Sequence, residues 1–372
     1  SNGLLIRGSS VRARQGPQMT NQDTCQSLIH LEIQLIRAEE EFTKGEKGII
    51  LKMRFLNFIK GSVLSKYSLV NILQARKVSN RLAQMPENWE KQIYNRIISG
   101  QPVLIGRLGG LEASCLGIYV DSKSKFRKPV RYAQALALKN RRQMQLCSNA
   151  GVYPVNDQTF DYFATEHLSA LSHLDVFSVW AKPSAWIESK CLDRKETLFV
   201  TGDASYPWPE SRDGSSEVGW GMALDNKKVL VVTPFVDSFE VQAPKLKKIF
   251  AGVAYPNMEL LFLRAPLTQG GLDDGTTYSS HLLGLKNQMS TLNFDIALIS
   301  AGAYSLPLAY HAKKMGKVGV HAGGALQIFF GVTGQRYDSY SQVQRFFNPE
   351  WKRPFVHERP ANWQNIEDGC YW

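Results

Sequence analysis

The sequence has few of the features that mark disulfide-stapled, zinc-stapled or membrane-spanning proteins. Its five cysteines are widely spaced, their number is odd, and no two form a Cys-x-x-Cys pair. This pattern argues for a reducing compartment and against a disulfide framework or a zinc site. No apolar run approaches the roughly 18 residues that a membrane-spanning helix needs, and no signal-peptide pattern opens the chain. We therefore expect a cytoplasmic protein.

Common nucleotide-binding and hydrolase motifs are also missing. No glycine turn matches the dinucleotide-binding Gly-x-Gly-x-x-Gly, and none is a P-loop that ends in Lys-Ser or Lys-Thr. No serine or cysteine lies in a nucleophile elbow, and the histidines show no metal-ligand spacing. Basic and aromatic residues do not interleave as they do in nucleic-acid modules, so no nucleic-acid partner is expected.

Acidic residues are scarce relative to basic ones: 44 lysines and arginines outnumber 33 aspartates and glutamates, which gives a net charge of +11. Such an excess favours polyanions, anionic membrane surfaces or phosphorylated small substrates. Residues 1–22 are predicted to form a flexible basic arm. Residues 23–90 are predicted to form a basic amphipathic helical region, without an acidic residue from Leu51 to Gln84. This region either lies peripherally on the anionic inner face of the membrane or packs on the main domain with its lysines in water.

The rest of the chain alternates apolar runs with helical patterns. The predicted strands are Val103–Ile105, Lys227–Phe235, Met258–Pro266, Phe294–Gly302 and Lys317–Gly323. A long helix is predicted from Pro129 to the turn at residues 149–151. Apolar strands that alternate with helices indicate an α/β fold, with a Rossmann-like, mostly parallel sheet and helices on both faces. We assign residues 91–345 to this domain and residues 346–372 to an aromatic tail that packs on it.

The sequence PVLIGRLGGLEASCLG, residues 102–117, is typical of a buried strand that runs into a helix through a glycine turn. Gly109 and Gly110 let the backbone approach a ligand closely, and free N–H groups at a helix start favour an anion. Arg107 adds a planar set of donors suited to phosphate, and Glu112 adds a carboxylate in the first turn of the helix. The plainer interpretation is a tight turn in which Arg107 and Glu112 neutralise each other.

Two later strand ends, at residues 302–304 and 323–325, carry similar glycine turns. Each leaves backbone donors open at a helix start, where a diphosphate can bind, although glycine is ordinary at such turns in any doubly wound fold. Ligands of parallel sheets bind at the carboxyl ends of the strands, so we expect these turns to share one site. The predicted diphosphate-binding residues are Arg107, Gly109, Gly110, Gly302, Ala303, Tyr304, Gly323, Gly324 and Gln327.

Carboxylates near the same edge of the sheet are candidates for acid–base chemistry or metal binding. Asp237 closely follows a predicted strand, and Asp273 and Asp274 lie in a glycine-rich loop. Hard carboxylate oxygens of this kind bind divalent cations. An Asp-Asp-Gly sequence is also a common turn, so both interpretations stay open for Asp273 and Asp274.

Five motifs together resemble bacterial glycosyltransferases of the GT-D fold. They are IGRLGGLE (105–112), KKVLVVTPF (227–235), FDIALISAGAYSLPLAYHAKKMGK (294–317), VHAGGALQIFFGVTGQR (320–336) and the terminal GCYW (369–372). The similarity covers roughly residues 95–372. It implies a Rossmann-type enzyme that transfers a sugar from a nucleotide sugar during glycan or glycoprotein assembly.

The family signature near the nucleotide reads Arg, an aromatic residue, Gly, Asp, Gly, Glu, and its Asp-x-Glu part is associated with a divalent metal, manganese or magnesium. In this chain Arg107, Gly109 and Glu112 match, Leu108 replaces the aromatic residue, and Gly110 stands in the place of the aspartate. Either the metal is dispensable, or this branch no longer catalyses transfer, or another carboxylate completes the metal site. The candidates for that metal site are Glu112 with Asp237, Asp273 or Asp274.

The motifs predict a glycosyltransferase that moves a sugar from a nucleotide sugar, expected to be a uridine diphosphate (UDP) sugar, to a glycan, glycolipid or glycoprotein acceptor. Arg107 and the glycine turns would neutralise the leaving diphosphate, while Glu112 and Asp237 are the candidate catalytic carboxylates. The alternative is a catalytically silent subunit of a polysaccharide assembly complex that binds a sugar nucleotide or glycan. A third hypothesis is a basic scaffold whose residues 23–90 bind membrane or a partner. Loops 201–220 and 267–280 are predicted to contact the acceptor or cover the site.

Overall fold

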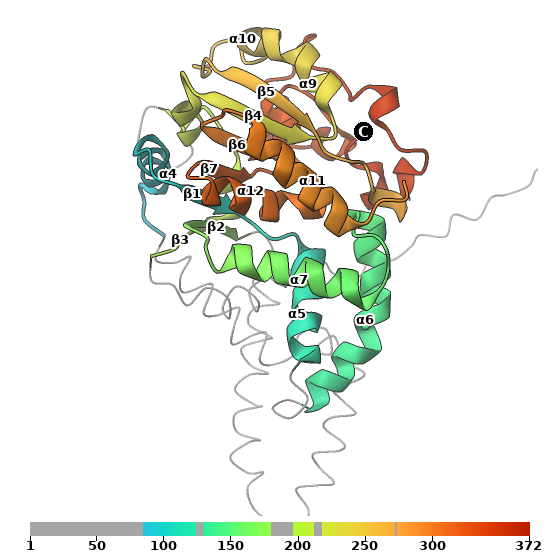
Figure 1. Ribbon diagram of the computed structural model, residues 1–372. Helices are drawn as coiled ribbons and strands as arrows, with labels where there is room; N and C mark the ends of the chain where they lie inside the picture. Colours follow the sequence, from blue (N-terminus) through green and yellow to red (C-terminus); the bar gives the residue numbers. More distant parts are fainter. Residues whose placement is uncertain (1–84, 124–128, 180–195, 212–217, 272–273) are drawn as a thin grey trace, which may run out of the picture. The chain divides into compact units, whose positions relative to one another are not determined.

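The computed structural model describes residues 85–123, 129–179, 196–211, 218–271 and 274–372. Within them the chain forms a seven-stranded sheet of order β3-β2-β1-β7-β6-β4-β5, in which all neighbouring strands are parallel (Figure 1). The expectation of an α/β fold with a parallel sheet is confirmed. The predicted basic arm and most of the predicted helical region, residues 1–84, lie outside the described residues.

The five strands predicted from apolar runs all form, with bounds that differ by a few residues. They are β1 (Val103–Gly106), β4 (Lys228–Thr233), β5 (Glu259–Arg264), β6 (Ile296–Ile299) and β7 (Val318–His321). Two further strands, β2 (Val176–Val179) and β3 (Leu198–Thr201), extend the sheet beyond β1. Neither was among the strands predicted from the apolar runs.

The strands alternate their side chains between two cores, one on each face of the sheet. In β4, Leu230 and Val232 enter one core, and Val229 and Val231 enter the other. The first core is completed by α5 (Gly110–Ser122), α6 (Pro129–Ala150), α7 (Asp157–Leu171), α11 (Tyr278–Thr291) and α12 (Ser305–Lys314). The second is completed by α4 (Trp89–Ile98), α9 (Val236–Gln242), α10 (Leu246–Ile249), α13 (Ala325–Phe329) and α14 (Ser341–Gln344). None of the helices in the described residues is long and apolar enough to cross a membrane.

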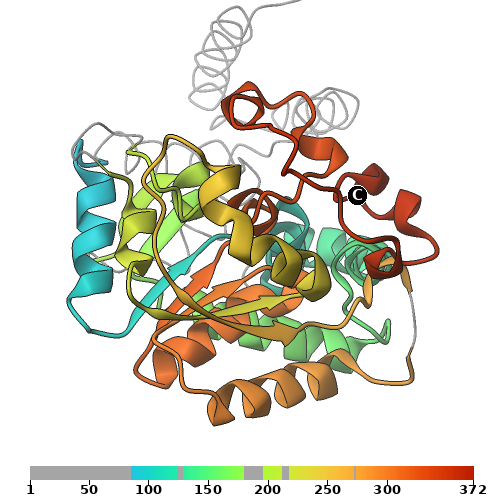
Figure 2. The same cartoon turned by 90° about the horizontal axis from the view of Figure 1, so that it is seen from above.

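The C-terminal segment returns to the sheet after β7, and in Figure 2 it appears in red on one side of the domain. The indole N–H of Trp372 donates a hydrogen bond to the carbonyl of Glu358 at 3.2 Å, and the Trp372 side chain is buried. The backbone N–H of Arg336 donates to the carbonyl of Cys370 at 3.0 Å. These contacts hold the last residues of the chain against the segment that follows β7.

The strand order creates a switch point between β1 and β7. The chain leaves β1 toward β2 and β3 on one side, whereas β4 to β7 build the other side of the sheet. The loops after β1 and β7 therefore diverge and open a crevice at the carboxyl ends of these two strands. Parallel sheets bind their ligands at such a crevice.

Candidate functional site

A cavity of about 790 Å³ lies at the carboxyl ends of β1 and β7. This volume is within the usual range for small-molecule sites, about 300–1,000 Å³. Seven of the predicted site residues line it, namely Arg107, Gly109, Gly110, Glu112, Gly302, Gly323 and Gly324. The structure thus brings together three glycine turns that are separated by about two hundred residues in the sequence.

Arg107 follows β1 directly and packs against the turn after β7. Gly323 has a left-handed φ of 58°, and a Cβ atom added there would clash with Nη2 of Arg107. The guanidinium of Arg107 also lies 5.7 Å from the centre of the Tyr206 ring, which lines the same cavity. Glycine at position 323 is therefore what allows Arg107 to lie against the backbone of this turn.

Helix α5 begins at the edge of the cavity, with Gly109 as its N-cap and Gly110 as its first residue. Glu112 folds its carboxylate back over the helix start, where a Cβ atom on Gly109 would clash with it. Burial raises the pKa of the Glu112 carboxyl, and the nearby carboxylate of Glu367 raises it further. A hydrogen bond from the backbone of Glu112 and the charge of Arg107 act in the opposite direction.

His321, the last residue of β7, hydrogen-bonds to Arg107, the residue that follows β1. Its Nδ1 lies 3.0 Å from the carbonyl oxygen of Arg107, and because a carbonyl only accepts, Nδ1 carries the hydrogen. Burial, together with the charge of Arg107, lowers the pKa of His321 to about 3. The imidazole is therefore neutral at physiological pH and leaves its Nε2 as an acceptor. His321 lines the cavity, although its sequence context shows no ligand spacing that would single it out.

The C-terminal segment supplies further polar groups to the cavity. Nη2 of Arg336 lies 2.6 Å from Oε2 of Glu367, and the Tyr371 hydroxyl donates to the same oxygen at 2.9 Å. The Arg336 guanidinium lies 4.6 Å from the centre of the Tyr371 ring. All three residues line the cavity, and none of them is among the site residues predicted from the sequence. The sequence pointed to this region through two of the five motifs, which end at Arg336 and at Trp372.

Three predicted site residues lie behind the cavity wall, where they support its lining. Gln327 is fully buried, and its Nε2 donates to the carbonyl of Tyr371 at 2.8 Å. Tyr304 is also buried and stacks on Tyr278 with ring centres 4.8 Å apart, while the Tyr278 hydroxyl donates to the carbonyl of Ala303. These residues do not line the cavity.

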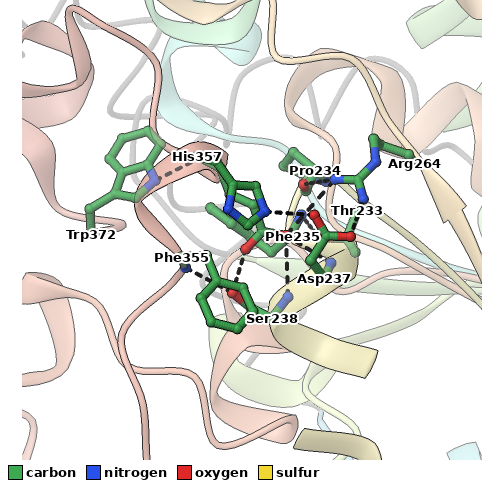
Figure 3. A network of polar contacts seen from close by, with 10 residues as sticks. Thr233, Pro234, Phe235, Asp237, Ser238, Arg264, Phe355, His357 and Trp372 are labelled. Carbon is green, nitrogen blue, oxygen red and sulfur yellow. Dashed lines mark hydrogen bonds and ion pairs between the residues drawn. The ribbon is translucent and has the colours of Figure 1, made fainter. Parts of the chain in front are cut away.

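Asp237 belongs to a separate network at the carboxyl ends of β4 and β5 (Figure 3). Its carboxylate lies 2.7 Å from Nε2 of His357 and 2.5 Å from Nη2 of Arg264. The hydrogen bond from His357 and the pairing with Arg264 hold the pKa of Asp237 below its usual value. Oε1 of Glu358 accepts hydrogen bonds from the backbone N–H groups of Asp237 and Ser238, at 2.8 and 3.2 Å. Asp237 therefore fastens the start of α9 to the C-terminal segment and does not line the cavity.

Asp274, in the glycine-rich loop, does not line the cavity either. Asp274 is exposed and pairs with Nε2 of His281 at 3.0 Å, and it also accepts from the backbone N–H of Thr276 at 2.9 Å. This is the geometry of an aspartate that closes a turn. Asp273 lies outside the described residues.

The donor set of the cavity does not fit a divalent metal held by protein ligands. The carboxylate of Glu112 is folded over the start of α5, and that of Glu367 accepts from Arg336. Among the described residues, the group of three with clustered ligand atoms is Asp237, His357 and Glu358, within 4.8 Å of one another. That group already faces a cation, since Arg264 pairs with Asp237.

Comparison of the chain with protein-family models, with curated proteins and with solved structures finds no match. The resemblance to GT-D glycosyltransferases therefore stays a prediction from the sequence motifs. The geometry of the cavity is the basis on which a function can be argued.

Proposed function

We propose that this protein is a glycosyltransferase of the GT-D type that takes a UDP sugar as donor and binds its diphosphate in the cavity between β1 and β7. The observation that carries the proposal is the meeting of Arg107, the start of α5 and the Gly323 turn around one cavity. A guanidinium and free backbone N–H groups are the usual protein partners of a phosphate. The switch point of a parallel sheet is the usual position for a nucleotide.

The same residues account for the chemistry of sugar transfer. Arg107 and the backbone donors neutralise the charge that develops on the diphosphate as its bond to the anomeric carbon breaks. The acceptor hydroxyl forms the new bond to that carbon and gives its proton to the Glu112 carboxylate. The raised pKa of Glu112 suits this role, because a general base is most effective when its pKa approaches the working pH.

The acceptor in this proposal is a glycan, glycolipid or glycoprotein. An acceptor carried by a lipid would match the basic composition of residues 23–90, which favours an anionic membrane surface.

Tyr206, which lines the cavity, comes from the long loop at residues 201–220. Trp208 and Trp220 of that loop are buried in the core.

Two observations favour a second candidate, a catalytically silent subunit that binds a sugar nucleotide. Gly110 stands where the resemblance predicts an aspartate, and the Glu112 carboxylate is turned onto its own helix. The two candidates share the binding site and differ in turnover. Release of UDP from a UDP sugar in the presence of acceptor separates them.

Binding of nucleoside diphosphates is the first test of the proposed function. At about 100 times its dissociation constant, UDP should stabilise the folded protein by about 2.7 kcal/mol, which raises the melting temperature by about 5 °C. A thermal-shift panel of nucleoside diphosphates and nucleotide sugars, each with EDTA and with manganese, measures this. Arg107→Gln should lose the shift. Arg353→Gln should keep it, because Arg353 pairs with Asp338 outside the cavity. If no nucleotide shifts the melting temperature, the proposal is wrong.

A further inference from the structure

Among the described residues, four charged side chains line the cavity, and their charges balance. Arg107 and Arg336 are the cations, and Glu112 and Glu367 are the anions. The two carboxylates line the same cavity, and the charge of Glu367 raises the pKa of Glu112. A diphosphate that enters this set without a cation of its own competes with the two carboxylates for the arginines, unless a carboxylate takes up a proton.

Arg336 approaches the same glycine turn as Arg107, one residue further along. A Cβ atom added to Gly324 would lie 3.1 Å from Nη1 of Arg336, and one added to Gly323 would clash with Nη2 of Arg107. Consecutive Cα atoms are about 3.8 Å apart, so the two guanidiniums flank neighbouring positions of one turn. This arrangement suits the two phosphoryl groups of a diphosphate, each of which would receive one planar set of donors.

Glu367 forms an ion pair with Arg336 from an exposed segment of the chain whose backbone is strained. The side chains of Arg336 and Glu367 are 33% and 41% exposed, so their ion pair is open to solvent. Glu367 and Asp368 both have left-handed backbone angles, with φ of 46° and 57°, which non-glycine residues adopt only at a cost. An exposed pair of this kind contributes little to the stability of the fold. The Glu367 carboxylate is therefore easily replaced by a phosphate, which carries more charge.

We infer that Arg336 is a second phosphate-binding residue of this cavity. In the free protein the Glu367 carboxylate pairs with Arg336, and a bound diphosphate displaces that carboxylate. The two arginines bind the diphosphate without a divalent metal. The inference rests on the proposed function, because it names the groups that recognise the donor in that same site. It also explains how a chain with Gly110 in place of the expected aspartate can bind a nucleotide sugar.

Isothermal titration calorimetry with inorganic pyrophosphate and with UDP tests the inference, in EDTA and in manganese. The wild-type protein should bind both probes in EDTA, with affinities that manganese does not raise. Glu367→Gln should bind them about tenfold more tightly, because Arg336 then has no competing carboxylate. Arg336→Gln should lose about 10-fold to 100-fold in affinity, as expected for the loss of a charge-assisted hydrogen bond. Arg336→Lys, which keeps the charge without the planar donors, should lose less.

Two controls show whether a loss of affinity reflects the site. Arg353→Gln removes a comparable exposed ion pair with Asp338 and should bind as the wild type does. Melting of each variant without ligand reports whether it is folded.

The results that would overturn the inference differ from those that would overturn the proposed function. If UDP binds only with manganese, or if Glu367→Gln weakens binding, Glu367 serves the ligand or a metal directly. The inference is then wrong, while the nucleotide site stands. If neither pyrophosphate nor UDP binds under any condition, both fail.

Discussion

Replacement of Glu112 by glutamine is expected to lower the rate of sugar transfer by about 10²-fold to 10⁴-fold, the range that general acid–base groups contribute. The same change is expected to raise the melting temperature of the free protein at pH 8. Glutamine keeps the size of the side chain and removes a carboxylate whose charge is disfavoured by burial and by Glu367. UDP release assays and thermal melts of the purified variant measure the two effects.

The sign of the stability effect follows from the direction of the pKa shift. Because the folded-state pKa of Glu112 is raised, the folded protein binds this proton more tightly than the unfolded chain does. The resulting stabilisation is complete below the unfolded pKa and is lost as the pH rises through the folded pKa. The gain from Glu112→Gln should therefore be larger at pH 8 than at pH 5. In the wild type, transfer should slow as the pH falls through the same raised pKa.

Glu259→Gln is the matched control for this prediction, because Glu259 lies on the edge strand β5 with its side chain 62% exposed. It should leave sugar transfer unchanged. Full transfer activity in Glu112→Gln would exclude Glu112 as the base. A lower melting temperature at pH 8 would mean that the contact of the Glu112 carboxylate with the start of α5 outweighs the cost of burying its charge.

Replacement of Gly323 by alanine is expected to weaken UDP binding by about 100-fold. The added methyl group would clash with the Arg107 guanidinium and push it away from the turn. The left-handed φ of 58° adds backbone strain of about 1–2 kcal/mol for an L-residue, so the variant should also melt at a lower temperature. Calorimetric titration with UDP measures the affinity of the folded variant.

Gly110→Ala is the control for the glycine substitution, because a Cβ atom at Gly110 meets no atom within 4 Å. It lies on the first turn of α5 and lines the same cavity, so it tests whether any methyl group there blocks the ligand. It should retain most of the affinity. Unchanged binding by Gly323→Ala, or an equal loss in Gly110→Ala, would contradict the placement of Arg107 at the phosphate.

The sequence made the parallel sheet and part of the cavity predictable for a simple reason. Buried parallel strands are continuous apolar runs, and where such a run ends in glycine and a helix follows, the turn lies at the ligand-binding edge of the sheet. This logic applied to the ends of β1, β6 and β7, and Arg107, Gly302 and Gly323 do meet at one cavity.

The direction in which the chain continues beyond a strand end is what the sequence could not supply, and Asp237 shows its consequence. Pro234 and Phe235 directly follow β4 and line the cavity, whereas Asp237 lies in the first turn of α9. There it pairs with Arg264, from the neighbouring strand β5, and does not line the cavity.

The C-terminal contribution to the cavity was hidden for a related reason. Arg336 and Glu367 meet across 31 residues that carry no long helix or strand, so no periodic pattern connects them. Arg336 and Arg107 are still further apart in the sequence, and only the folded turn at Gly323 and Gly324 brings both to one place.

The most direct test of the proposed diphosphate site is a crystal structure of the protein with UDP, grown in the presence of EDTA. We expect the diphosphate at the turn of Gly323 and Gly324, with Arg107 and Arg336 on its oxygens and the Glu367 carboxylate displaced. UDP bound instead in the neighbouring cavity of about 450 Å³, which Arg264 and His357 line, would contradict this placement.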